Sequence, residues 1–222
     1  MVGVAALYAV LVACTSAPQS VASSPTSGAS GQSTAVAAGL VPVKDFAQEF
    51  CAHATSNAPC PKGSVPAALR RPFHLPSVAP DARCPVSQPN PRIWSRLAPG
   101  LGPGPVGPVG FGPHAILRYR HRKGSQGWGH QKVLWAASPT YDGPILIRGA
   151  RIDGPGFVGF NLGYGAPLAE LQLPPGSAPA TGHHGWRGWP SYTRVRDPGC
   201  YAYQVDGTDF SYVIVFRAEP LA

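Results

Sequence analysis

Glycine and proline recur every few residues along almost the whole chain, and this limits what it can fold into. The 222 residues include 27 glycines and 27 prolines, and both residue types break or end helices. Long helices are therefore disfavoured, and short strands joined by turns are favoured. Because 44% of the residues are hydrophobic, the chain can still bury a core, so we expect an all-β protein.

The region after residue 113 contains the apolar and β-branched runs expected for such strands. Turn pairs of the kind found in hairpins occur among them, at Asp142-Gly143, Asp153-Gly154 and Asp206-Gly207. We expect strands at 115–120, 132–137, 145–152, 157–161, 168–173, 192–196, 200–205 and 212–217. Many short strands at this spacing are typical of a β-sandwich or barrel, and we place this domain at residues 114–222.

The segment DPGCYAY, residues 197–203, resembles the approach to strand F in immunoglobulin-like domains, where Asp-x-Gly-x-Tyr-x-Cys places a tyrosine corner. The resemblance implies that the Tyr201 hydroxyl bonds to upstream backbone and that Tyr203 stands where the family has its core cysteine. Cys200 is not at that position, so the family's intersheet disulfide is not implied. Trp135 would be the buried core tryptophan, and the implied fold is an immunoglobulin-like β-sandwich.

An uncharged apolar segment, residues 2–13, lies at the start of the sequence. It is shorter than the roughly 20 residues that cross a bilayer as a helix. It fits the apolar core of a secretory signal, although no lysine or arginine precedes Lys44. We therefore expect a signal peptide at 1–13.

The end of that segment, Leu11-Val12-Ala13-Cys14, resembles the lipobox of bacterial lipoproteins, whose signal is cleaved before a cysteine that is then acylated. The resemblance implies lipidation of Cys14 and an extracytoplasmic, membrane-anchored protein. The alternatives are an ordinary signal peptide with an unmodified Cys14, which would make the protein secreted, and a truncated transmembrane anchor.

The cysteine count agrees with lipidation, since it leaves an even number of other cysteines. These are Cys51, Cys60, Cys84 and Cys200. In an exported chain four cysteines suggest two disulfides, with three possible pairings. The simplest pairing closes a short loop with Cys51–Cys60 and leaves Cys84–Cys200. The alternative is four free thiols.

Two segments lie between the signal and the β domain. Residues 14–43 carry no charge and are rich in Ser, Thr, Ala and Gly, which is typical of a disordered, flexible tether. Residues 44–113 begin with a short helix at Lys44–Ala54, where apolar residues recur at helical spacing. The rest of this segment is an irregular Pro/Gly-rich arm, which we expect to pack on the domain.

Patterns of catalysis and cofactor binding are missing from the sequence. It has no Gly-x-Ser-x-Gly elbow and no metal-ligand spacing among its seven histidines. Two Gly-x-Gly-x-x-Gly matches, at 102–107 and 154–159, lack the following helix that a dinucleotide site needs. We therefore expect no catalytic residues, no metal, no cofactor and no enzyme activity.

Positive charge is in excess, with a net charge of +8. The basic residues are mostly arginine in a chain also rich in Ala, Gly and Pro, as expected of GC-rich coding as well as of an anionic partner. Their one dense cluster is RYRHRK at 118–123. No nucleic-acid-binding module is recognisable, so we expect no nucleic-acid partner.

Two Gly-rich segments, 122–130 and 183–192, combine tryptophan with basic residues. Exposed aromatics beside arginine stack on sugars or anchor protein partners. The candidate contact residues are Trp128, Trp186, Arg187 and Trp189. The alternative is that Trp186 and Trp189 cap the core. We expect a non-catalytic envelope lipoprotein that acts as a binding or structural module for another envelope protein, or binds carbohydrate or cell-wall polymer through these tryptophans.

Overall fold

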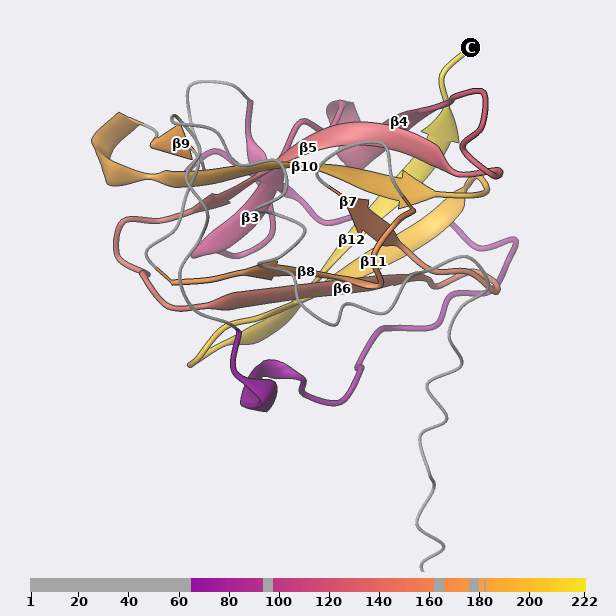
Figure 1. The fold of residues 1–222 in the computed structure, drawn as a ribbon. Helices are drawn as coiled ribbons and strands as arrows, with labels where there is room; N and C mark the ends of the chain where they lie inside the picture. The colour runs from indigo at the N-terminus through magenta and orange to yellow at the C-terminus, as the bar shows by residue number, and fades with distance from the viewer. Residues whose placement is uncertain (1–64, 94–97, 162–165, 176–179, 182) are drawn as a thin grey trace, which may run out of the picture. The chain divides into compact units, whose positions relative to one another are not determined.

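The computed structural model describes residues 65–93, 98–161, 166–175, 180–181 and 183–222 (Figure 1). The all-β prediction is confirmed: in this part of the chain the only helical elements are three short 3-10 turns, at Ala67–Leu69, Pro113–Ala115 and His183–Gly185. The expected signal peptide, Cys14, tether, short helix and Cys51–Cys60 bridge lie outside the described residues.

The first layer of strands is antiparallel throughout and centres on the long pair β5–β10. Strands β7 and β9 pair with the other edge of β10, and β3 pairs with the other edge of β5. The bounds are β3 (Val106–Val109), β5 (Gly129–Ala137), β7 (Gly159–Asn161), β9 (Ala180–Thr181) and β10 (Arg187–Val195).

The second layer has the strand order β12-β11-β6-β8, again with antiparallel neighbours. The β11–β12 hairpin turns at Asp206-Gly207, as predicted from the sequence. The bounds are β6 (Ile145–Arg151), β8 (Glu170–Leu173), β11 (Gly199–Asp206) and β12 (Ser211–Pro220).

Strand β4 (Ile116–His121) joins the two layers. It pairs antiparallel with β5 at one end and parallel with β12 along most of its length. On the opposite side an isolated bridge between Phe160 and Leu168 connects β7 to the chain just before β8. The strands therefore curve around a common interior. Strands β1 (Pro89–Asn90) and β2 (Gly100–Leu101) form a separate two-stranded sheet, from which Leu101 packs into the same core.

The interior is aromatic where the layers meet. Trp135 of β5 and Tyr203 of β11 are both fully buried, and their ring centroids lie 5.1 Å apart in an edge-on contact. The hydroxyl groups of Tyr203 and Thr193 lie 2.7 Å apart, which satisfies both polar groups in the core. Trp135 is thus buried as predicted, and Tyr203 connects the layers by packing and a hydrogen bond.

All eight strands predicted from the sequence are present, although several bounds differ. The largest difference is at β10, which begins at Arg187, five residues before the predicted start at 192. A second difference is β3, which lies in the arm predicted to be irregular and yet pairs with β5. The sheet therefore begins upstream of residue 114.

The hydrogen bond predicted from Tyr201 to upstream backbone is also present. The Tyr201 hydroxyl donates a hydrogen bond of 2.8 Å to the backbone carbonyl of Asp197, and its ring stacks on Phe216 of β12. Replacing Tyr201 with phenylalanine keeps the stacking and removes the hydrogen bond. We expect it to lower the free energy of unfolding by about 1 kcal/mol at neutral pH.

This difference should shrink in alkali. Burial raises the pKa of Tyr201 to about 12, whereas tyrosine in an unfolded chain ionises near pH ~10. Above that pH the unfolded state loses a proton that the folded state keeps, so stability falls as pH rises towards the folded pKa. Denaturant titrations of both proteins should therefore converge as pH rises above ~10. A difference that stays constant there would contradict the pKa assignment.

Candidate functional site

The tryptophans predicted to contact a ligand are mostly interior. Trp128 is 2% exposed and Trp189 is 1% exposed, so neither presents a stacking face, and the expectation of exposed rings is wrong for both. The reason for Trp189 is that β10 extends to Arg187, which places Trp189 on the core side of a strand, opposite Trp135. Trp186 is half-buried and packs against the cluster around Ile93.

The predicted contact residue Arg187 has a structural role. Its guanidinium lies over the Trp189 ring, 5.2 Å from the centroid, and donates to the backbone carbonyl of Tyr141. Burial lowers the pKa of Arg187. These contacts fasten the loop between β5 and β6 to the start of β10. Any partner contact through Trp186 and Arg187 stays a prediction.

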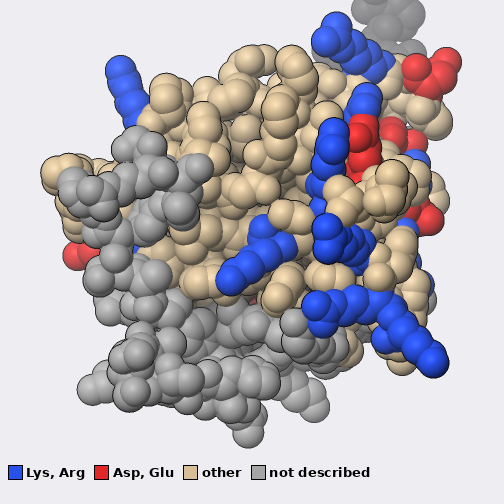
Figure 2. All heavy atoms as spheres, turned by 90° about the horizontal axis from the view of Figure 1, so that it is seen from above, with Lys and Arg blue, Asp and Glu red and all other residues tan. Residues whose placement is uncertain are grey.

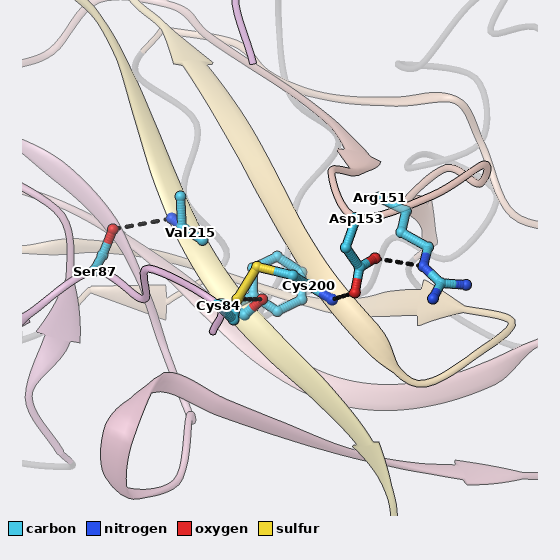
Figure 3. The surroundings of a disulfide bond; sticks show 7 residues. Cys84, Ser87, Arg151, Asp153, Cys200 and Val215 are labelled. Atoms are coloured by element: carbon cyan, nitrogen blue, oxygen red, sulfur yellow. Dashed lines mark hydrogen bonds and ion pairs between the residues drawn. A yellow bond between two sulfur atoms is a disulfide. The ribbon is translucent and has the colours of Figure 1, made fainter. Parts of the chain in front are cut away.

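The predicted Cys84–Cys200 disulfide is present and fastens the arm to the start of β11 (Figure 3). Two backbone hydrogen bonds support the same attachment, from Val78 to Ile152 and from Ser87 to Val215. Asp153 completes the site: one carboxylate oxygen accepts from the Cys200 amide at 2.8 Å. The other accepts from Arg151 at 2.6 Å.

A groove of about 520 Å³ lies between the arm and the turn after β6. Its charged residues, Arg151 and Asp153, are paired with each other. The remainder is largely apolar, so the groove contains no acid–base or nucleophile pair. Its lining includes Phe73, Leu75, Val78, Ala150 and Ile152.

The arm is also attached to the sheet upstream of Cys84, through a buried carboxylate, Asp206. It is fully buried at the end of β11 and pairs with Arg148 of β6 at 2.7 Å. Arg71 of the arm lies 3.6 Å from the same carboxylate and donates to backbone carbonyls of the β11–β12 turn, including that of Gly207 at 2.7 Å. This network is a structural clamp between the arm and the sheet.

The outer surface of β4, β5 and β10 carries a cluster of positively charged side chains. In β4, Leu117 and Tyr119 point into the core, so the alternate positions Arg118 and Arg120 point outward. Figure 2 shows Lys and Arg side chains gathered over part of the side that these strands occupy in Figure 1. We call this surface the basic face and define it by Arg118, Arg120, Arg122, Lys123, Lys132 and Arg194.

Strand pairing brings distant members of the basic face into one row. Arg120 pairs with His130, and His130 pairs with Arg194. Directly paired residues in adjacent strands point to the same side of a sheet. The 118–123 cluster is recognisable in the sequence, whereas Arg194 lies 72 positions beyond Arg122 and could not be assigned to it.

Arg194 is an unusual member, because it is charged and only 4% exposed. Its Nε donates to the Gly129 carbonyl at 3.2 Å and one terminal nitrogen donates to Asn161 at 3.4 Å. Burial, followed by the charge of Arg122, lowers the pKa of Arg194. Among the described residues no carboxylate pairs with it.

The charges of the basic face also affect a histidine. Burial, followed by the charges of Arg122 and Arg194, lowers the pKa of His130. Its ring packs edge-on against Tyr192, with centroids 5.6 Å apart. A lowered pKa favours the neutral imidazole, which agrees with a region where positive charge already accumulates.

Known proteins give little further information. No protein-family model matches the chain, and no curated protein matches it. Among solved structures, a "Putative Lipoprotein from Bacillus anthracis" is matched with a TM-score of 0.39 and 11% sequence identity, over 63% of this chain and 88% of that one. A likeness of this extent carries no argument about function.

Among the described residues, no helix has the length and apolar character needed to cross a bilayer. Within the same part of the chain, no three His, Cys, Asp or Glu side chains gather as a metal site would require.

Proposed function

We propose that the protein is an exported lipoprotein, held at the membrane by acyl groups on Cys14, whose β domain acts by binding and not by catalysis. The observation that carries this proposal is the Cys84–Cys200 disulfide in a chain that also has a lipobox. Disulfides persist in oxidising compartments and are rare in the cytosol. Multiple acyl chains on Cys14 would supply stable anchoring.

The binding role is supported by the surface of the domain. The basic face is an exposed array of cations on a rigid sheet, whereas the groove beside the arm has its two charged residues paired with each other. We propose another component of the cell envelope as the partner, in keeping with the anchor.

Mass spectrometry of the amino terminus of the native protein tests the anchor. We expect a mature chain that begins at Cys14, with acyl groups on the cysteine, and a Cys14→Ser variant that is released from the membrane fraction. Alkylation under non-reducing conditions should leave Cys84 and Cys200 unlabelled. An unmodified Cys14, or reduced Cys84 and Cys200 in the native protein, would overturn the proposal.

For the fold we propose an immunoglobulin-like arrangement. Strands β4-β5-β10-β7 would correspond to A-B-E-D and β6-β11-β12 to C-F-G, with Tyr201 as the tyrosine corner. The chain departs from the family pattern because β4 also pairs with β12 and β8 extends the second layer. An experimental structure with a different pairing order would contradict this proposal.

A further inference from the structure

Four cations of the basic face have no carboxylate partner among the described residues. Arg118, Arg120, Lys132 and Arg194 form no ion pair with any described residue. The acid nearest to them in strand register is Glu219, which is opposite Arg118 and is already paired with Arg217. The charges of these four side chains are therefore not balanced by an ion pair within the described residues.

Burial of Arg194 makes this charge costly to keep. A buried charge normally has a counter-ion, because removing it from water is unfavourable. Arg194 donates hydrogen bonds to Gly129 and Asn161, whereas a guanidinium offers five N–H groups. An anionic ligand over this row would supply the missing negative charge to Arg194 and to the exposed cations around it.

The geometry favours an extended anionic surface over a small ligand. The cations project from neighbouring strands, which lie about 4.8 Å apart, so they form a two-dimensional array. The groove beside the arm and the smaller cavity near Asn90 are lined by other residues. An array of cations spread over neighbouring strands matches repeated phosphate headgroups.

We propose that the basic face docks the domain onto the anionic phospholipid headgroups of the membrane that holds it. The identity of that membrane rests on the proposed acyl anchor at Cys14. Residues 15–64 separate this cysteine from Val65, and 50 residues reach roughly 170 Å when extended. A domain of this size has a radius of gyration of about 15 Å, so the linkage allows any of its faces to reach the bilayer.

Docking of this kind follows simple electrostatics. Each Lys or Arg near an anionic bilayer increases binding by roughly five-fold. Added salt weakens the attraction, because charges in water are screened over about 10 Å at ~0.1 M ionic strength. An acyl anchor together with a basic surface would hold the domain flat against the membrane instead of at the end of its linker.

Vesicle sedimentation of the full chain with Cys14→Ser tests the proposal without any acyl group. The probes are vesicles of phosphatidylcholine with phosphatidylglycerol, compared with vesicles of phosphatidylcholine alone. Apolar residues 2–13 contribute equally to both, so the ratio of the two partition coefficients measures the charge effect. We expect a strong preference for phosphatidylglycerol that disappears at high salt.

Two variants with equal net charge locate the effect. Replacing Arg120 and Lys132 with glutamine should reduce the phosphatidylglycerol preference roughly 30-fold. Replacing Arg83 and Arg92 with glutamine changes the net charge equally, and both are exposed arginines outside the basic face. This control should keep the phosphatidylglycerol preference within about two-fold of that of the parent protein. Both pairs are exposed, so circular dichroism and thermal denaturation should confirm that the fold is intact.

The other outcomes overturn the proposal. An equal loss in both variants would show that net charge acts and that the basic face does not. Binding that is tighter to soluble polyphosphate than to phosphatidylglycerol vesicles would assign the surface to a soluble polyanion. An unacylated native Cys14 with the preference intact would refute the anchor alone, whereas an acylated Cys14 without the preference would refute the docking alone.

Discussion

Replacing Asp206 with alanine is expected to lower the free energy of unfolding by about 3–5 kcal/mol. The side chain is fully buried, and its Oδ2 accepts a hydrogen bond of 2.7 Å from Arg148. Alanine leaves the partly buried Arg148 guanidinium without a counter-ion. Removing one partner of a buried ion pair costs far more than the pair contributes in total, because the remaining charge stays desolvated.

Three further attachments depend on the same carboxylate. Ser211 donates to it at 2.7 Å across the β11–β12 hairpin. The Gln204 amide donates to it at 3.1 Å and also donates to the Pro72 carbonyl of the arm. Arg71 approaches from the arm. The loss of Asp206 should therefore loosen the arm around Pro72 as well as the end of β11.

Chemical denaturation of the full chain measures the effect. Asp209→Ala is the matched control, because Asp209 is an exposed acid three positions further along the same turn and its loss should cost at most about 0.5 kcal/mol. Replacing Asp206 with leucine and Arg148 with methionine together should cost less than Asp206→Ala. A loss below about 1 kcal/mol for Asp206→Ala would show that the pair is not buried as described.

The sequence predicts the turn at Asp206 but not the residues that bind its carboxylate. The Asp206-Gly207 turn is a local pattern, and the hairpin is where the pattern predicts it. The partners of the carboxylate are not local, since Arg148 is 58 residues away and Arg71 lies in a part of the arm that has neither helix nor strand. Pairing over such distances leaves no sequence pattern around Asp206.

The error at β10 has a different physical cause. Every second residue of β10 points inward, as the two-residue period of a strand requires. These residues are Trp189, Ser191, Thr193 and Val195. Pro190 and the neighbouring glycines hide that alternation in the sequence. The segment therefore resembles an aromatic loop, and the sequence leaves open whether its tryptophans lie at the surface or cap the core.

The basic face could be predicted from the sequence only in part. The alternation in β4 predicts that Arg118 and Arg120 share a side of the sheet. Arg194 joins them only because β5 lies between β4 and β10. Sequence reasoning predicted these strands without their order, so the 118–123 cluster appeared as an isolated basic run.

The second large effect is expected at the Cys84–Cys200 disulfide. Its cysteines are 116 positions apart, so the bridge greatly restricts the unfolded chain. In the chain-entropy model a loop of this length contributes about 5 kcal/mol, and measured losses for native disulfides are typically about 2–5 kcal/mol. Replacing both cysteines with serine should lower the free energy of unfolding by an amount in that range.

The structure also predicts where the loss appears first. The arm is attached to the sheet around Arg71 by the Asp206 network and around Cys84 by the disulfide. With both cysteines replaced, amides between Val78 and Ser87 should exchange hydrogen much faster, because the backbone bonds from Val78 to Ile152 and from Ser87 to Val215 then hold this segment to the sheet without the disulfide. Amides of β5 and β10, which pair over nine residues, should change only as far as global stability falls.

Combining Asp206→Ala with the double serine variant tests whether the two attachments hold the arm independently. If Asp206 and the disulfide hold the arm independently, the losses from Asp206→Ala and from the double serine variant should add to within about 0.5 kcal/mol. A smaller combined loss would mean that release at one attachment already frees the other. Exchange that rises equally in the arm and in β10 when the disulfide is removed would contradict a local role, because the arm would then unfold only together with the whole sheet.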